Sequence, residues 1–200
     1  MLTEKDFEFI YRNFDSTPVR FDCGKVCASK NGGIPYCCDS GWLLPVMYKS
    51  EFVYLMERTN LWKRFKPKTK HEKNIVEETD KDTVFGECLG HERCDRRFRS
   101  VSCRLFPFEP YLDLEGNLLG MVFNYSLGNK CPLVDKPKLI SKKFISDQIK
   151  MWNYIFKKDP SECDVYRDQS IQVRRYLSRK KKPIYILTPK GYYKGKYRLR

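Results

Sequence analysis

The chain has 200 residues, and 41% of them are hydrophobic, which is enough for an ordinary buried core, so disorder is not the default interpretation. Basic residues outnumber acidic ones, 39 to 25, giving a net charge of +14 that makes nucleic acid or another acidic partner plausible. No apolar run of about 20 residues and no signal peptide pattern occurs, so the sequence predicts a soluble, cytoplasmic protein with no transmembrane segment.

The first half of the chain is predicted to alternate short regular elements with polar loops. In chain order these are a helix over residues 2–14, a cysteine-rich loop over 23–38, a helix over 49–62, an exposed basic stretch over 63–73, and a strand with its lead-in over 75–85. Thr3 is placed as the N-cap of the first helix, ahead of Asp6. The sequence Asn31-Gly32-Gly33 favours a turn inside the loop.

The second half is predicted to hold a hairpin and two helices. Strands over 111–114 and 118–125 flank the turn sequence Glu115-Gly116-Asn117, and an apolar helical stripe over 144–156 is expected to pack on the cysteine-bearing core. Asp159-Pro160 then opens a helix to about residue 179. The fold class is therefore predicted as α+β: a small, loop-rich metal-binding domain at 1–160, and a C-terminal helix with a basic tail at 161–200.

Nine cysteines without a secretion signal point to metal ligation rather than disulfides. Eight of them form an early and a late group, and Cys163, alone in a helical context, is interpreted as a spare thiol. The early group is Cys23, Cys27, Cys37 and Cys38, and the late group is Cys88, Cys94, Cys103 and Cys131. Because four thiolates satisfy a tetrahedral zinc or a cubane cluster, eight make either two sites or one site with ligands to spare.

Two other interpretations of these residues stay open. Free cysteines are often buried as small hydrophobic side chains, but the adjacent Cys37 and Cys38 cannot easily both point into one apolar core. His91 lies between two cysteines and is either a substitute ligand or an exposed loop histidine.

The late cysteines stand in a recognisable pattern. Cys94 and Cys103 are separated by eight residues, Cys103 opens the sequence Cys-Arg-Leu-Phe-Pro-Phe, Arg99 precedes it, and Cys131 is followed by Pro132. Over residues 21–133 the chain resembles the YkgJ-type cysteine-cluster family, described as zinc- or iron-chelating proteins. It differs in having Ser100 where that family usually has proline, and in a longer gap between Cys27 and Cys37.

The resemblance implies an iron–sulfur cluster, 4Fe-4S foremost, or zinc, and a relationship to flagellin lysine N-methylases that leaves the reaction open. Arg99 and Arg104 are predicted to bind this cofactor indirectly, since guanidinium groups can donate hydrogen bonds to cluster sulfur. The alternative is that they form surface salt bridges with Glu92, Asp95 or Glu109.

Two functions follow. One is a redox or catalytic iron–sulfur protein, acting on a protein or RNA substrate as the methylase relatives suggest. The other is a structural zinc module whose basic surface binds nucleic acid or a protein partner. That surface consists of Arg174, Arg175, Arg179, Lys180, Lys181, Lys182, Lys190, Lys194, Lys196, Arg198 and Arg200, interleaved with Tyr185, Tyr192, Tyr193 and Tyr197. Neither a radical-SAM cysteine spacing nor a Walker or dinucleotide-binding glycine motif is present.

Overall fold

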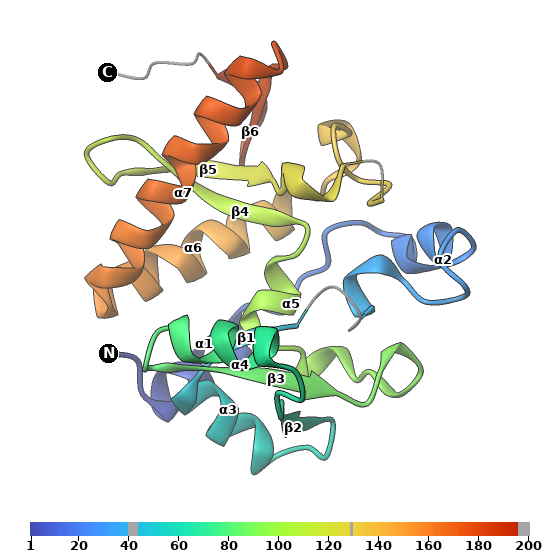
Figure 1. Cartoon of the computed structure of the whole chain (residues 1–200). Helices are drawn as coiled ribbons and strands as arrows, with labels where there is room; N and C mark the ends of the chain where they lie inside the picture. The colour runs from blue at the N-terminus through green and yellow to red at the C-terminus, as the bar shows by residue number, and fades with distance from the viewer. Residues whose placement is uncertain (40–43, 129, 196–200) are drawn as a thin grey trace.

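Two antiparallel sheets, each covered by helices, form the α+β structure of this protein (Figure 1). The computed structural model describes residues 1–39, 44–128 and 130–195. The helices in these ranges are α1 (Glu4–Asn13), α2 (Cys23–Ala28), α3 (Lys49–Met56), α4 (Lys70–Glu78), α5 (Val101–Leu105), α6 (Lys142–Lys158) and α7 (Pro160–Arg179). The strands are β1 (Val46–Tyr48), β2 (Trp62–Arg64), β3 (Thr83–Cys88), β4 (Phe108–Leu112), β5 (Leu118–Phe123), β6 (Ile184–Thr188) and β7 (Gly191–Gly195).

The short helix α5 connects the two halves of the molecule. The first sheet has the order β1-β3-β2 and packs with α1 and α3, and the second has the order β4-β5-β6-β7 and packs with α6 and α7 (Figure 1). In Figure 1, α5 lies between these halves, while α2 and the following loop stand at one side. Because α5 carries Cys103 and Arg104, its position decides how the cysteine-rich region is built.

The predicted start of α1 is confirmed. The hydroxyl of Thr3 accepts from the Asp6 amide, and the Asp6 carboxylate accepts from the Thr3 amide over 2.8 Å, which completes a capping box. The apolar face of the helix is buried through Phe7 and Ile10, both 0% exposed. The capping residues and the apolar period thus agree with the tertiary structure.

Three boundaries in the first half differ from the prediction. Residues 23–28 of the predicted loop form helix α2, because Asp22 caps the amides of Gly24 and Lys25. The helix predicted over 49–62 ends at Met56, and Trp62 begins β2. Residues 70–78 form α4 before strand β3, so the lead-in to the strand is helical. The predicted glycine turn is confirmed, with φ of +59° and +87° at Gly32 and Gly33.

The elements of the second half agree more closely with the prediction. Strands β4 and β5 form the expected hairpin, with Gly116 in the turn at φ +88°. Helices α6 and α7 are also confirmed, and Asp159 lies between them. The apolar stripe of α6 packs against β5, β6 and α7, however, and not mainly on the cysteine-bearing region.

The segment predicted as a basic tail is partly a β-hairpin. Strands β6 and β7 pair with each other, and β6 joins the second sheet through the pairing of Met121 with Leu187. Residues 184–195 therefore belong to the same sheet as β4 and β5. Residues 196–200 lie outside the described residues.

A buried carboxyl group holds α5 against the first half. Glu51 of α3 is 0% exposed, and its Oε1 accepts hydrogen bonds from the Tyr11 hydroxyl at 2.7 Å and from the Val101 amide at 2.6 Å. These contacts join α1, α3 and the first turn of α5. Burial raises the pKa of Glu51 to about 7, although both hydrogen bonds favour the carboxylate.

We predict that replacing Glu51 by Gln removes a pH dependence of stability. The folded-state pKa of about 7 lies above the ordinary value of 4.5, so the folded protein holds this proton more tightly. The stabilisation from this group is complete below the ordinary value and is lost as the pH rises through 7. Between about pH 4.5 and about pH 8, wild type should lose on the order of 3 kcal/mol of unfolding free energy relative to Glu51→Gln.

Urea denaturation at a series of pH values measures this difference. Glu57→Gln is the matched control, because Glu57 caps the same helix but is exposed, and its curve should follow that of wild type. If the unfolding free energies of wild type and Glu51→Gln changed with pH in the same way, the Glu51 carboxyl would have the same pKa in the folded and unfolded states, and the prediction would be wrong.

Candidate metal centre

All eight cysteines of the two sequence groups line two adjoining cavities. A wide cavity of about 380 Å³ is lined by the thiol-bearing residues Cys23, Cys27, Cys37, Cys38, Cys103 and Cys131. A narrow cavity of about 40 Å³ is lined by Cys37, Cys38, Cys88, Cys94 and Cys103. Cys163 lines neither; its Sγ donates to the Gly116 carbonyl at 3.4 Å.

Separate chain segments bring these thiols together. Cys23 and Cys27 lie one turn apart on α2, and Cys37 and Cys38 lie in the 3-10 turn Tyr36–Cys38. Cys88 is the last residue of β3, and Cys94 ends the 3-10 turn His91–Arg93. Cys103 lies on α5, and Cys131 lies in the segment that follows the β4–β5 hairpin. All nine cysteines are free thiols, so no disulfide competes for these sulfur atoms.

Two hydrogen bonds hold the segment that carries Cys94 and Cys103 in place. Ser100 is the N-cap of α5, and its hydroxyl accepts from the Cys103 amide at 3.2 Å. The Trp62 indole donates to the Phe98 carbonyl at 2.7 Å and so holds the loop between Cys94 and α5 on strand β2. The sequence carried no signal for this second contact, because its two partners are 36 residues apart.

Burial opposes ionisation of most of these thiols. It raises the pKa of Cys103 to about 12 and that of Cys131 to about 11, and it also raises the pKa of Cys23 and Cys88. These side chains therefore prefer the neutral thiol form while no cation is near. A metal ion reverses this preference, since a coordinating thiol loses its proton.

Cys37 and Cys38 behave as a pair. Their Sγ atoms are 3.9 Å apart, and the hydrogen bond between them raises the pKa of Cys37 and lowers that of Cys38 to about 7. The hydrogen bond therefore favours ionisation of Cys38 over ionisation of Cys37. The Cys38 side chain is on the wall common to both cavities.

Arg99 contacts the thiol cluster directly. Its Nε donates to the Cys94 Sγ at 3.1 Å, and its charge lowers the pKa of the Cys38 thiol, after the larger effects of Cys37 and burial. Its side chain also lines both cavities. This placement matches the predicted role of a cationic partner that donates to sulfur.

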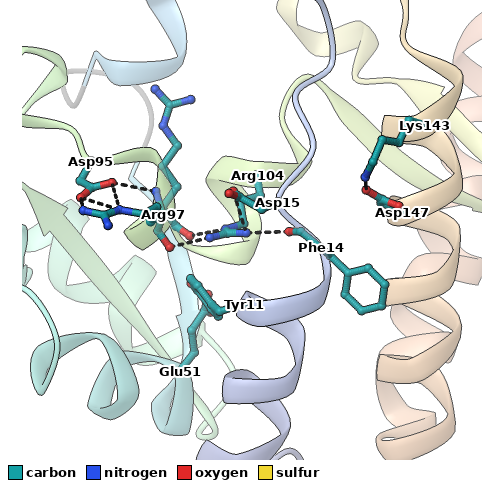
Figure 2. Close-up of polar contacts among 10 residues, drawn as sticks. Tyr11, Phe14, Asp15, Glu51, Asp95, Arg97, Arg104, Lys143 and Asp147 are labelled. Carbon is teal, nitrogen blue, oxygen red and sulfur yellow. Dashed lines mark hydrogen bonds and ion pairs between the residues drawn. The ribbon is translucent and has the colours of Figure 1, made fainter.

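Arg104 makes different contacts (Figure 2). Its guanidinium donates to the carbonyls of Phe14 and Arg97, both at 2.6 Å, and of Arg99 at 3.0 Å. It lies 4.3 Å from the Tyr11 ring centroid and 3.5 Å from an Asp15 carboxylate oxygen. The hydrogen bonds that the structure gives Arg104 thus go to backbone oxygen and none to sulfur, and they bind α1 and the Arg97 loop to α5.

The carboxylates expected as alternative partners are placed elsewhere. Asp95 pairs with Arg97 at 2.7 Å rather than with Arg99 or Arg104. Among the described residues, no ion pair joins Glu92 or Glu109 to either arginine. Burial raises the pKa of Glu109 to about 7.

The site contains further residues that sequence analysis did not select. Ser16 lines the wide cavity, and its hydroxyl is buried without a hydrogen-bond partner. Arg96 lines the same cavity. So does His91, which the sequence left open as a substitute ligand or an exposed loop histidine, and which is half-buried in the structure. Ser16 precedes the first cysteine group by seven residues, so only the fold associates it with the thiols.

The thiols line open cavities and are not assembled into a coordination site. Within the described ranges, no three His, Cys, Asp or Glu side chains converge closely enough to hold a metal ion. The donor set nevertheless fits a thiophilic metal, because eight free thiols and a guanidinium face shared cavities. Coordination would require the thiols to move together from this arrangement.

Part of the predicted basic surface is not accessible. Arg174 is 4% exposed and donates to the Leu112 carbonyl, with its guanidinium 4.8 Å from the Tyr111 ring centroid. Arg174 therefore stabilises the packing of α7 on β4. The prediction that it belongs to a phosphate-binding surface is wrong. Lys196, Tyr197, Arg198 and Arg200 lie outside the described residues.

Comparison with known proteins gives no relative for this arrangement. No family description, curated protein or solved structure matches the chain. In the part of the chain that the structure covers, no helix has both the length and the apolar character needed to cross a membrane.

We predict that lysine substitutions separate the roles of the two arginines. Arg104→Lys should lower the free energy of unfolding by about 2–4 kcal/mol, because an ammonium cannot replace all three charged hydrogen bonds to carbonyls. Arg99→Lys should cost less, about 1 kcal/mol, because only one contact with sulfur is lost. Denaturant unfolding of both variants measures the difference, and equal losses would contradict it.

Proposed function

We propose that this chain is a cysteine-ligated metal protein that holds an iron–sulfur cluster or zinc at the cavities described above. The observation that supports this most is the narrow cavity, into which four separate chain segments bring five cysteines and one arginine. Thiolate sulfur is the preferred protein ligand of both metals, and a guanidinium offsets the negative charge of a thiolate site.

Simple burial of cysteine explains this arrangement less well. A cysteine that acts only as a small hydrophobic side chain needs no neighbouring cation, yet Arg99 donates to Cys94 beside four other thiols. Of the eight cysteines, only Cys27 is fully buried; the others are half-buried around the cavities. This partial exposure suits ligands that remain reachable for an incoming metal.

We favour iron over zinc by a small margin. The chain has eight grouped thiols and two histidines in all, which suits a cluster, and the resembled YkgJ-type family points the same way. On this proposal the protein is a redox or modifying iron–sulfur protein with a protein or RNA substrate. The alternative is a structural zinc module, whose site would be closed and redox-inactive.

Metal binding would also stabilise the cysteine-rich segment. Helix α2 makes its main contacts with the 3-10 turn Tyr36–Cys38, which is itself part of the same segment. Ligation of Cys23 or Cys37 together with Cys103 or Cys131 would therefore tie this segment to the rest of the molecule. Because burial keeps most of the thiols protonated, this ligation would release protons.

We predict that metal content depends on the cavity thiols and not on the remaining one. Protein purified without oxygen should contain iron with matching sulfide, or zinc, and Cys94→Ser should contain less. Cys163→Ser is the matched control, because Cys163 lines neither cavity and should retain the wild-type metal content. Elemental analysis with a visible absorption spectrum measures this. Metal-free wild type, or equal loss in both variants, would contradict the proposal.

We further propose a nucleic-acid contact at the β6–β7 hairpin. The register pairs Tyr185 with Lys194 and Leu187 with Tyr192, so Tyr185, Tyr192 and Lys194 share one face of the sheet. Tyr192 is 39% exposed, and the Lys194 ammonium lies 6.0 Å from the Tyr185 ring centroid. An aromatic ring beside a cation is suited to stacking a base while neutralising a phosphate.

We predict that Tyr192→Ala weakens binding of a fluorescent single-stranded oligouridine by about 1–3 kcal/mol, the usual worth of one stacked base. Lys194→Glu should weaken it as well and reduce its dependence on salt. Lys5→Glu, an exposed substitution on α1, serves as the control for net charge. Fluorescence anisotropy at several salt concentrations measures this, and no binding at low salt would refute the nucleic-acid contact.

A further inference from the structure

The two cavities divide the eight thiols in a definite way. Cys23, Cys27 and Cys131 line only the wide cavity, and Cys88 and Cys94 line only the narrow one. The remaining thiols, Cys37, Cys38 and Cys103, line both. Because the two exclusive sets together contain five thiols, one centre with four ligands cannot use all of them.

Three thiols are shared by the two cavities. Cys37 and Cys38 lie together in the 3-10 turn Tyr36–Cys38, and Cys103 lies on α5. Because each of them lines both cavities, each can complete either set.

The two exclusive sets also come from different parts of the fold. The thiols that line only the wide cavity come from α2 and from the segment after β5, whereas those that line only the narrow cavity come from β3 and its following loop.

We infer that the chain builds two separate thiolate centres rather than one. The narrow centre includes Cys88 and Cys94, the wide centre includes Cys23, Cys27 and Cys131, and the three shared thiols complete the two ligand sets. Among the shared thiols, the adjacent residues Cys37 and Cys38 have Sγ atoms 3.9 Å apart. The inference rests on the proposed metal binding and specifies its stoichiometry and ligands.

The two centres differ in the space around them. The narrow cavity holds about 40 Å³, and Leu61, Trp62 and Arg99 are among the residues that line it. The wide cavity holds about 380 Å³ and also contains the unpartnered Ser16 hydroxyl and Arg96. The wide centre therefore has room for a small solvent-borne ligand beside its metal, and the narrow centre does not.

Two double variants, matched in the number of thiols removed, test the division. Cys88→Ser with Cys94→Ser removes two ligands of the narrow centre only, and Cys23→Ser with Cys27→Ser removes two of the wide centre only. Each should retain about half of the wild-type metal content, and the combined variant should retain almost none. If either double variant loses all of the metal, or if one of them loses none, a single centre is shown and the inference is wrong.

Native mass spectrometry of wild type keeps the inference testable if a variant does not fold. Two bound centres per chain support it, and one bound centre overturns it. A wild-type chain without any metal would instead refute the proposed function itself, so the two failures are distinguishable.

The rate of metal removal tests the difference in space. With EDTA as the probe, the variant that keeps the wide centre, Cys88→Ser with Cys94→Ser, should lose its metal severalfold faster than the variant that keeps the narrow centre. Equal rates, or faster loss from the narrow centre, would contradict the assignment of the open centre to the wide cavity.

Discussion

The arrangement of the site depends on how α5 is held between the two halves of the molecule. Glu51 binds the first turn of this helix through the Val101 amide and binds α1 through the Tyr11 hydroxyl. Arg104, on the same helix, donates to three carbonyls, one of them in Phe14 at the end of α1. The Glu51 Oε1 atom and the nearly buried Arg104 guanidinium thus hold a short helix in one position, and in that position Cys103 lines both cavities.

The thiols of the site differ in the direction in which their pKa is shifted. Burial favours the neutral thiol at Cys103 and Cys131, whereas the contact with Cys37 favours the thiolate at Cys38. Arg99 lies beside this thiolate and donates to Cys94. On the proposed function, Cys38, Cys103 and Cys131 would hold the metal as thiolates and would release their protons on binding it. Metal binding would therefore depend on pH and would be coupled to stability.

The hairpin β6–β7 adds a separate surface to the same protein. Its pairing with β5 makes it an extension of the second sheet, and it places Tyr192 and Lys194 on one face and Tyr193 on the other. The tyrosines and lysines that alternate along this part of the sequence therefore do not form one continuous surface. Only side chains that alternate onto the same face can act together on a ligand.

Much of the secondary structure was determined locally, and the sequence therefore predicted it. The capping box of α1, the hairpin around Gly116 and helices α6 and α7 depend on contacts within a few residues, and the α+β class follows from them. The same holds for the grouping of the eight thiols, since residue type and spacing are read directly from the chain.

Only the tertiary structure decided which thiols share a cavity, and which arginine reaches sulfur. Arg99 and Arg104 are five residues apart and chemically identical, yet one donates to Cys94 and the other to carbonyls as distant in sequence as Phe14. Such long-range partners leave no period, cap or turn in the sequence, because they depend on where separate elements pack and not on the residues nearby.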